Sequence, residues 1–242
     1  MAQMNERVVT VTRITFQKEM ERLQNQLMDL GVLVENAVLQ SVEILKKQDL
    51  EAARRLVAAD TDVNRMRYEI ETETLILIAR QQPMAGDLRT LAAVLEIATE
   101  LERIADYAKG IAKITIKLGT EPLMKPLIDI PRMAVLSADM LHRALLCFAD
   151  RDASTARAIA AEDQVLDDLY DQVYRELITY VLADAKNIDG ANHLMWVAHN
   201  LERTADRSVN ICERVIFMTT GEMIELDDDE PISSENDETQ EV

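Results

Sequence analysis

One six-residue motif occurs twice in this chain of 242 residues, at Leu101–Asp106 (LERIAD) and, 100 positions later, at Leu201–Asp206 (LERTAD). The agreement extends to apolar positions on both sides of the motif. The matched pairs include Val94/Leu194, Leu95/Met195, Ile97/Val197, Ala98/Ala198 and Ile111/Ile211. These positions recur at the i, i+3, i+4, i+7 spacing that is typical of the buried stripe of a helix. The repeat predicts two similar helical halves.

Three helices are expected in each half, because long amphipathic stretches alternate with turn signals. The expected helices span residues 13–47, 49–82, 88–117, 132–149, 153–185 and 190–218. Pro83 stops the second helix, because the residue before a proline avoids helical geometry, and Asp87 is expected to cap the third helix. Further turns are expected at residues 150–152 and 187–190. The predicted fold class is all-α, with two similar three-helix bundles.

The domain boundary is expected where three prolines, Pro122, Pro126 and Pro131, interrupt the helical pattern. The predicted organisation is a first bundle over residues 1–117, a Pro-rich linker over 118–131, a second bundle over 132–220 and an acidic tail over 221–242. Residues 222–242 contain ten acidic side chains and no basic one. A segment of this composition buries too little apolar surface to offset the entropy of ordering, so the tail is expected to be disordered.

Charge and apolar patterning exclude several classes of protein. A formal net charge of −18 argues against binding to nucleic acid, which requires basic residues, and against direct attraction to anionic lipid. We find no apolar run long enough to cross a bilayer and no signal peptide, so a cytoplasmic location is expected. Cys147 and Cys212 lie in apolar helical sequence, as buried thiols do in a reducing compartment.

Each copy of the motif carries two carboxylates four residues apart, Glu102 with Asp106 and Glu202 with Asp206. Like charges at this helical spacing repel by a few tenths of a kcal/mol, so their duplication needs an explanation. A divalent or ferric cation, which binds several oxygen ligands, would supply one. Further candidate ligands lie near the second pair and on the preceding helix of each half. They are Asn210 and Glu213 on the motif helix, Asp60 and Asn64 in the first half, and Asp163 and Asp167 in the second.

Solvated helix faces are the alternative explanation in a chain with 44 acidic residues. Arg103 and Arg203 are expected to point away from the core and to leave the acidic pairs unneutralised. The three histidines, His142, His193 and His199, are expected to be surface or packed side chains, since none completes a Glu-x-x-His motif of a ferritin-like oxidase. The sequence also lacks a Gly-rich phosphate loop, a catalytic triad and an HExxH motif, so no enzymatic activity is expected.

The motifs resemble those of the PhoU family of bacterial phosphate-transport accessory regulators. The resemblance rests on the two LERxAD helices, on QQPMAGDLR at residues 81–89 and on the pattern that runs from Asn200 through Glu202, Asp206 and Asn210 to Glu213. It covers about residues 13 to 220. It implies two three-helix bundles related by a pseudo-twofold axis, with metal clusters held by the acidic pairs. Gly110 and Lys113 replace the Asn and Glu of the second copy, so the two sites are expected to differ in affinity.

The resemblance also implies a function and partners. Proteins of this family restrain phosphate uptake and keep the phosphate-starvation regulon off when phosphate is plentiful. They act between the ATPase subunit of a phosphate ABC importer and a phosphate sensor histidine kinase. A homodimer and a bound Mg, Mn or Fe ion are expected on the same ground. Two alternatives stay open, an acidic helical metalloenzyme and a metal-free helical scaffold.

Overall fold

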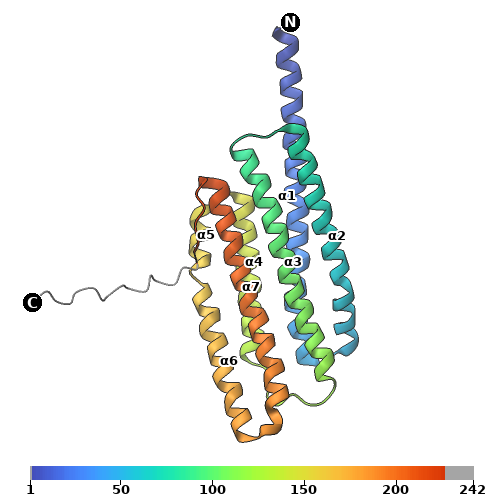
Figure 1. The fold of residues 1–242 in the computed structure, drawn as a ribbon, viewed down its shortest axis with the longest axis vertical. Coiled ribbons are helices and arrows are strands. Elements are labelled where there is room, and N and C mark those ends of the chain that lie inside the picture. Colours follow the sequence, from blue (N-terminus) through green and yellow to red (C-terminus); the bar gives the residue numbers. More distant parts are fainter. Residues whose placement is uncertain (1, 227–242) are drawn as a thin grey trace, which may run out of the picture.

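The computed structural model describes residues 2–226, with side chains from residue 13, and every regular element in this range is a helix (Figure 1). The elements are α1 (Ala2–Lys47), α2 (Leu50–Gln81), α3 (Gly86–Leu118), α4 (Asp129–Asp150), α5 (Ala153–Ala160), α6 (Asp163–Ala183), the 3-10 turn η1 (Ala185–Asn187) and α7 (Ile188–Thr220). The all-α prediction is confirmed. Among the described helices, none combines the length and the apolar character that crossing a membrane requires.

The turns of the first half follow the expected residues except at one cap. Asp49 caps α2, because its side chain accepts a hydrogen bond from the backbone N–H of Ala52 at 2.9 Å. Gln82 ends α2 in the left-handed conformation directly before Pro83. The prediction that Asp87 is the N-cap of α3 is wrong. The helix already begins at Gly86, so Asp87 lies in its first turn.

The second half differs from its predicted helices at three places. The single helix expected over residues 153–185 is broken at Ala161 and Glu162 into α5 and α6. Arg143 of α4 contacts the chain at this break, where its guanidinium donates to both carboxylate oxygens of Glu162 at 2.8 and 2.5 Å. The prediction of a turn at residues 187–190 is also wrong, because α7 begins at Ile188. Pro131 lies in the first turn of α4, where its missing N–H has no partner to lose, so this helix begins at Asp129 rather than at residue 132 as predicted.

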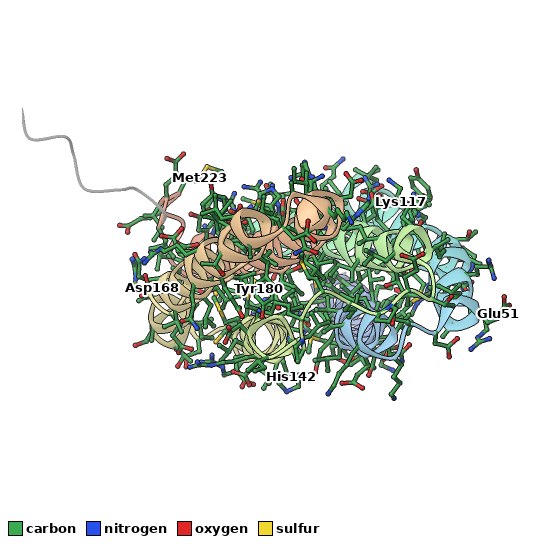
Figure 2. All side chains as sticks on the ribbon, turned by 90° about the horizontal axis from the view of Figure 1, so that it is seen from below. Glu51, Lys117, His142, Asp168, Tyr180 and Met223 are labelled. Carbon is green, nitrogen blue, oxygen red and sulfur yellow. The ribbon has the colours of Figure 1, made fainter. Side chains whose placement is uncertain are left out.

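The two halves lie side by side along the length of the molecule (Figure 1). Between the halves, α3 packs against α7 and α1 packs against α4. Helices α2 and α6 flank this central group, and Figure 2 shows Glu51 of α2 and Asp168 of α6 toward opposite edges. The repeated motif therefore lies on the two helices that join the halves.

Helices α3 and α7 run antiparallel with a register that reflects the repeat. Glu96 pairs with Arg214, and Glu100 accepts from Asn210, so residue numbers rise along one helix as they fall along the other. The motif alanines Ala105 and Ala205 are both buried, at 4% and 0% exposure, as predicted. This arrangement is what a pseudo-twofold axis between the halves produces.

The apolar core is continuous from one half to the other. Gly31 of α1 shows how closely the halves approach, because a Cβ added there would lie 2.3 Å from Leu145 Cδ1 of α4. The close approach explains why a glycine is retained within a long helix, where it disfavours helix formation by about 1 kcal/mol relative to alanine. The division into separate units at residues 118–131 stays a prediction.

The segment that follows α7 is packed at its beginning, whereas the sequence predicts a tail from residue 221. Ile224 and Leu226 are partly buried against the core, and the Leu226 N–H donates to Glu213 Oε1 at 2.8 Å. The rest of the predicted tail, residues 227–242, lies outside the described residues. The second half therefore includes at least six residues beyond α7.

Candidate functional site

The first acidic cluster, defined here as Asp60, Glu102 and Asp106, lies between α2 and α3. Lys109 joins two of its members, with Nζ 2.6 Å from Asp60 Oδ2 and 3.0 Å from Asp106 Oδ1. Asn64 also donates to Asp60 Oδ2, at 3.1 Å. The structure thus brings together the predicted residues of the first half, and it adds a lysine that the sequence prediction did not include.

The second acidic cluster, defined as Asp163, Asp167, Glu202 and Asp206, belongs to α6 and α7. Glu202 and Asp206 are largely shielded, with side chains 20% and 19% exposed, whereas Asp106 in the first half is 51% exposed. Asp163 and Asp167 are partly buried on α6, one turn apart. The second copy of the acidic pair is therefore the more buried of the two.

Burial and the charge of a neighbouring carboxylate disfavour the charged form of one glutamate in each cluster, Glu102 in the first and Glu202 in the second. Burial, and then the charge of Asp106, raises the pKa of Glu102. The effect is larger in the second cluster, where burial, followed by Asp206, raises the pKa of Glu202 to about 7. The neighbouring Asp167 contributes in the same direction. Burial also raises the pKa of Asp206. A cation bound among these groups would offset both effects.

Arg203 and His199 contact the second cluster from its rim. Arg203 Nη1 lies 2.9 Å from Asp206 Oδ2, so the expectation that Arg203 leaves the pair unneutralised is wrong. His199 Nδ1 lies 3.2 Å from Glu202 Oε2, and its ring packs edge-on against Trp196 at 5.6 Å. His199 is three residues before Glu202, and this helical spacing is the sequence signal that could have found it. Arg103 contacts Glu100, at 3.1 Å, rather than the first pair.

Asn210 and Glu213 make their polar contacts away from the second cluster. Asn210 Nδ2 donates to Glu100 Oε2 of α3 at 3.3 Å. Glu213 is nearly buried and binds the backbone of Leu226 and the side chain of Arg214. Their role as metal ligands stays a prediction.

The residues of the second cluster fit a hard cation by their donor chemistry. Glu202 Oε2 is shielded from solvent and accepts no hydrogen bond, although His199 Nδ1 lies 3.2 Å away. A buried carboxylate oxygen without a partner is costly, and oxygen-rich sites of this kind suit Mg, Mn or Fe ions. Among the described residues, side chains of His, Cys, Asp and Glu form no group of three already arranged for a metal ion.

Comparisons with known proteins identify the repeat. The family model described as "PhoU domain" matches twice, over residues 27–115 and 130–215. A protein of Aquifex aeolicus, named phosphate-specific transport system accessory protein PhoU homolog, is 36% identical over 207 residues that cover 86% of this chain and 94% of that one. A Rhizobium meliloti protein of the same name is 33% identical and is covered to 87%.

Solved structures agree over the same range. The PhoU crystal structure from Streptococcus pneumoniae is 30% identical and superposes with a TM-score of 0.81, covering 87% of this chain and 99% of that one. PhoU from Pseudomonas aeruginosa, at 31% identity, also gives 0.81, with coverage of 86% and 100%. The duplicated match, the relatives and the shared fold lead to one conclusion: the chain belongs to the PhoU family.

Proposed function

We propose that this protein is a regulator of phosphate transport that restrains phosphate uptake and keeps phosphate-starvation genes off when phosphate is plentiful. The observation that supports the proposal is the PhoU match to both repeats, together with relatives named as accessory proteins of a phosphate-specific transport system. The protein acts by binding. Its partners are the ATPase subunit of a phosphate importer and a phosphate sensor histidine kinase, and it works in the cytoplasm as a homodimer.

A deletion strain tests this regulatory role. Cells without the gene are expected to express phosphate-starvation genes in high phosphate and to over-accumulate phosphate, and the wild-type gene is expected to restore both. Unchanged expression and phosphate content, with neither importer nor kinase recovered alongside the tagged protein, would show that the proposal is wrong.

We propose that a divalent or ferric ion binds at the acidic clusters, with the second cluster as the principal site. Glu202 and Asp206, with Asp163 and Asp167 from α6, would hold it. The ion supplies positive charge that neutralises the buried carboxylates and ties α6 to α7. A ligand that binds only the folded state stabilises it by mass action, so Mn²⁺ is expected to raise the melting temperature of protein stripped with EDTA.

The variant Glu202→Gln/Asp206→Asn, which keeps side-chain shape and removes two charges, is expected to lose this stabilisation. A double variant of exposed acids on the same half, Asp168→Asn/Asp171→Asn, is the matched control. Oxygen consumption by the ferrous-loaded protein would instead favour the metalloenzyme alternative. A melting temperature that does not respond to any metal would favour the metal-free scaffold.

A further inference from the structure

Four ring-bearing side chains of α6 and α7 form what we call the aromatic patch. Its members are Tyr170 and Tyr174 on α6 and Trp196 and His199 on α7. The centroid of the His199 ring lies 5.6 Å from that of Trp196 and 6.1 Å from that of Tyr170, so His199 links the two helices through favourable ring contacts. Because α6 and α7 run antiparallel, Trp196 and Tyr174 both lie about one turn from the contact between Tyr170 and His199, toward the connection between the helices (Figure 1).

Much of the aromatic surface of the patch is open to solvent. Trp196 is 54% exposed and Tyr174 is 44% exposed. Tryptophan and tyrosine provide a large share of the binding energy at many protein interfaces, because they offer a large contact area and lose little conformational freedom. An exposed tryptophan and an exposed tyrosine at the same level of two packed helices are therefore typical of a binding surface.

The first half of the molecule carries no such rings at the corresponding positions. The sequence offset is 103 residues between α2 and α6 and 100 residues between α3 and α7. The residues that correspond to the aromatic patch are Arg67, Glu71, Glu96 and Thr99. There Arg67 pairs with Glu71 at 2.9 Å. The repeat thus folds with an ion pair where the second half has two tyrosines, so the packing of the repeat does not require the rings.

The helix segments that carry the rings are acidic. Residues 163–174 and 192–202 together contain five acidic side chains and no basic one. Glu202 lies near the rings, with Oε2 3.2 Å from His199 Nδ1, and burial, followed by the charge of Glu202, raises the pKa of Tyr170. The faces of aromatic rings are also negative, so the rings and the carboxylates favour the same kind of ligand, a cation.

We propose that the aromatic patch binds an arginine- or lysine-bearing segment of a partner protein, with the cationic side chain over the rings of Trp196 and Tyr174. Arginine fits better than lysine, because its planar guanidinium stacks on rings. Among the described residues, the cation that lies over a ring is Arg67 over Tyr68 in the first half, at 5.3 Å, so the chain places no cation of its own on the patch.

A second copy of this chain fits the patch less well than a basic partner does. It has a formal net charge of −18 and would bring the same acidic surface, and like charges across an interface oppose binding. The inference rests on the proposed role in binding partner proteins, and it specifies a surface and the chemistry of the segment that this surface recognises.

Trp196 reports on the patch directly, because it is the only tryptophan of the chain. The full-length protein is titrated with an arginine tetrapeptide with blocked ends, while Trp196 emission and its quenching by acrylamide are measured. We expect a saturable change in emission and protection from acrylamide. Both effects should weaken at high salt, which screens exposed charges. A glutamate tetrapeptide is the matched control and is expected to have neither effect.

Three variants separate the contribution of the rings from that of the acidic charge. Tyr174→Leu is expected to weaken binding of the arginine tetrapeptide by about twofold to thirtyfold, the range of a cation–π contact, whereas Tyr174→Phe keeps the ring and should bind like the wild type. Tyr68→Leu removes an exposed tyrosine of the first half and should have no effect. Should Tyr174→Leu fail to fold, Trp196→Leu, followed by calorimetry, carries the same expectation as Tyr174→Leu.

The regulatory use of the patch is tested in the deletion strain. A folded Tyr174→Leu/Trp196→Leu protein is expected not to restore repression of phosphate-starvation genes in high phosphate, whereas Tyr68→Leu is expected to restore it. If the wild-type gene itself does not restore repression, the proposed function is wrong, and the titration still shows whether the patch binds a cationic segment.

Several results would overturn the inference while leaving the regulatory function intact. One is the absence of a saturable change at Trp196 with the arginine tetrapeptide. Another is a folded Tyr174→Leu protein that binds the peptide as tightly as Tyr174→Phe, since the rings would then contribute nothing. Tighter binding of tetramethylammonium than of the peptide would indicate a site for a small cation instead. A double variant that loses peptide binding but restores repression would place the regulatory partner on another surface.

Discussion

Replacing Glu202 by glutamine should change how the stability of the metal-free protein depends on pH. The pKa of Glu202 is raised from its ordinary value of 4.5 to about 7, first by burial and then by Asp206. The folded state therefore holds this proton more tightly than the unfolded state does. Ionising Glu202 in the folded state therefore lowers the free energy of unfolding. This penalty is absent below about pH 4.5, where both states are protonated. It grows as the pH rises and is complete above about pH 7.

The size of the penalty follows from the pKa difference, since one pKa unit corresponds to about 1.4 kcal/mol. For Glu202 this gives at most about 3.5 kcal/mol at pH 8, and the 20% exposure of the side chain makes the true value smaller. In a chain of this size, 1 kcal/mol moves the melting temperature by about 2–4 °C. Glu202→Gln is therefore expected to melt up to about 10 °C higher than the wild type at pH 8 in EDTA, with little difference at pH 4.5.

Thermal melts at half-unit pH intervals, in EDTA, measure this difference. Glu162→Gln serves as a control with the opposite sign, because the hydrogen bond from Arg143 lowers the pKa of Glu162. The stabilisation by Glu162 is present above the unfolded pKa and is lost as the pH falls, so this variant is expected to be less stable than the wild type at pH 8. If Glu202→Gln and the wild type melt in parallel from pH 4.5 to 8, the burial argument is wrong.

Three further changes test the packing and the ends of the helices. Gly31→Ala should lower the free energy of unfolding by up to about 2 kcal/mol. The clash with buried Leu145 costs about 1–3 kcal/mol, and the higher helix propensity of alanine offsets about 1 kcal/mol of that cost. A variant that is more stable than the wild type in urea unfolding would contradict the close α1–α4 contact. Asp49→Ala should lower the free energy of unfolding by about 1 kcal/mol, because the side-chain cap of α2 is lost, and Asp49→Asn should lower it by only a few tenths of a kcal/mol. Equal urea midpoints for the two variants would show that Asp49 does not stabilise the helix as a cap. Ending the chain after Leu226 should leave the melting temperature unchanged. Ending it after Thr220 should lower the melting temperature by several degrees, because the packed segment with Ile224 and Leu226 is removed. If both truncations lower the melting temperature equally, the stabilising contacts lie beyond the described residues.

Periodicity predicts the helices and their duplication, because each helix has to bury one apolar stripe whatever its neighbours are. It does not predict the break at Glu162, where no proline or glycine marks the chain. At that break Glu162 accepts hydrogen bonds from Arg143, which lies 19 residues earlier on another helix, so the contact cannot be predicted from local periodicity. The sequence also does not predict the N-cap of α3, because Ala85 takes a positive φ there and no residue typical of that conformation marks the position.

The candidate site shows the same limit. The i, i+4 spacing identifies the acidic pairs, since residues four apart share one helix face. The contacts that a pair receives from another helix depend on how the helices pack, and the spacing of residues along one helix does not predict that packing. Lys109 lies three residues after Asp106, so its contact with Asp106 could be predicted, but its contact with Asp60 requires the register of α2 against α3.

The interface between α3 and α7 explains why differences between the repeats matter. A pseudo-twofold axis through this interface relates the pair α2 and α3, which holds the first acidic cluster, to the pair α6 and α7, which holds the second. Figure 2 shows Glu51 of α2 and Asp168 of α6 toward opposite edges of the molecule. Any chemical difference between the two clusters has to come from positions where the copies diverge. At the interface Gly110 leaves space for the side chain of Asn200, while the equivalent Asn210 reaches Glu100. Lys109 and Val209 diverge in the same way one residue earlier, which places the charge difference directly beside the motif that the two halves share.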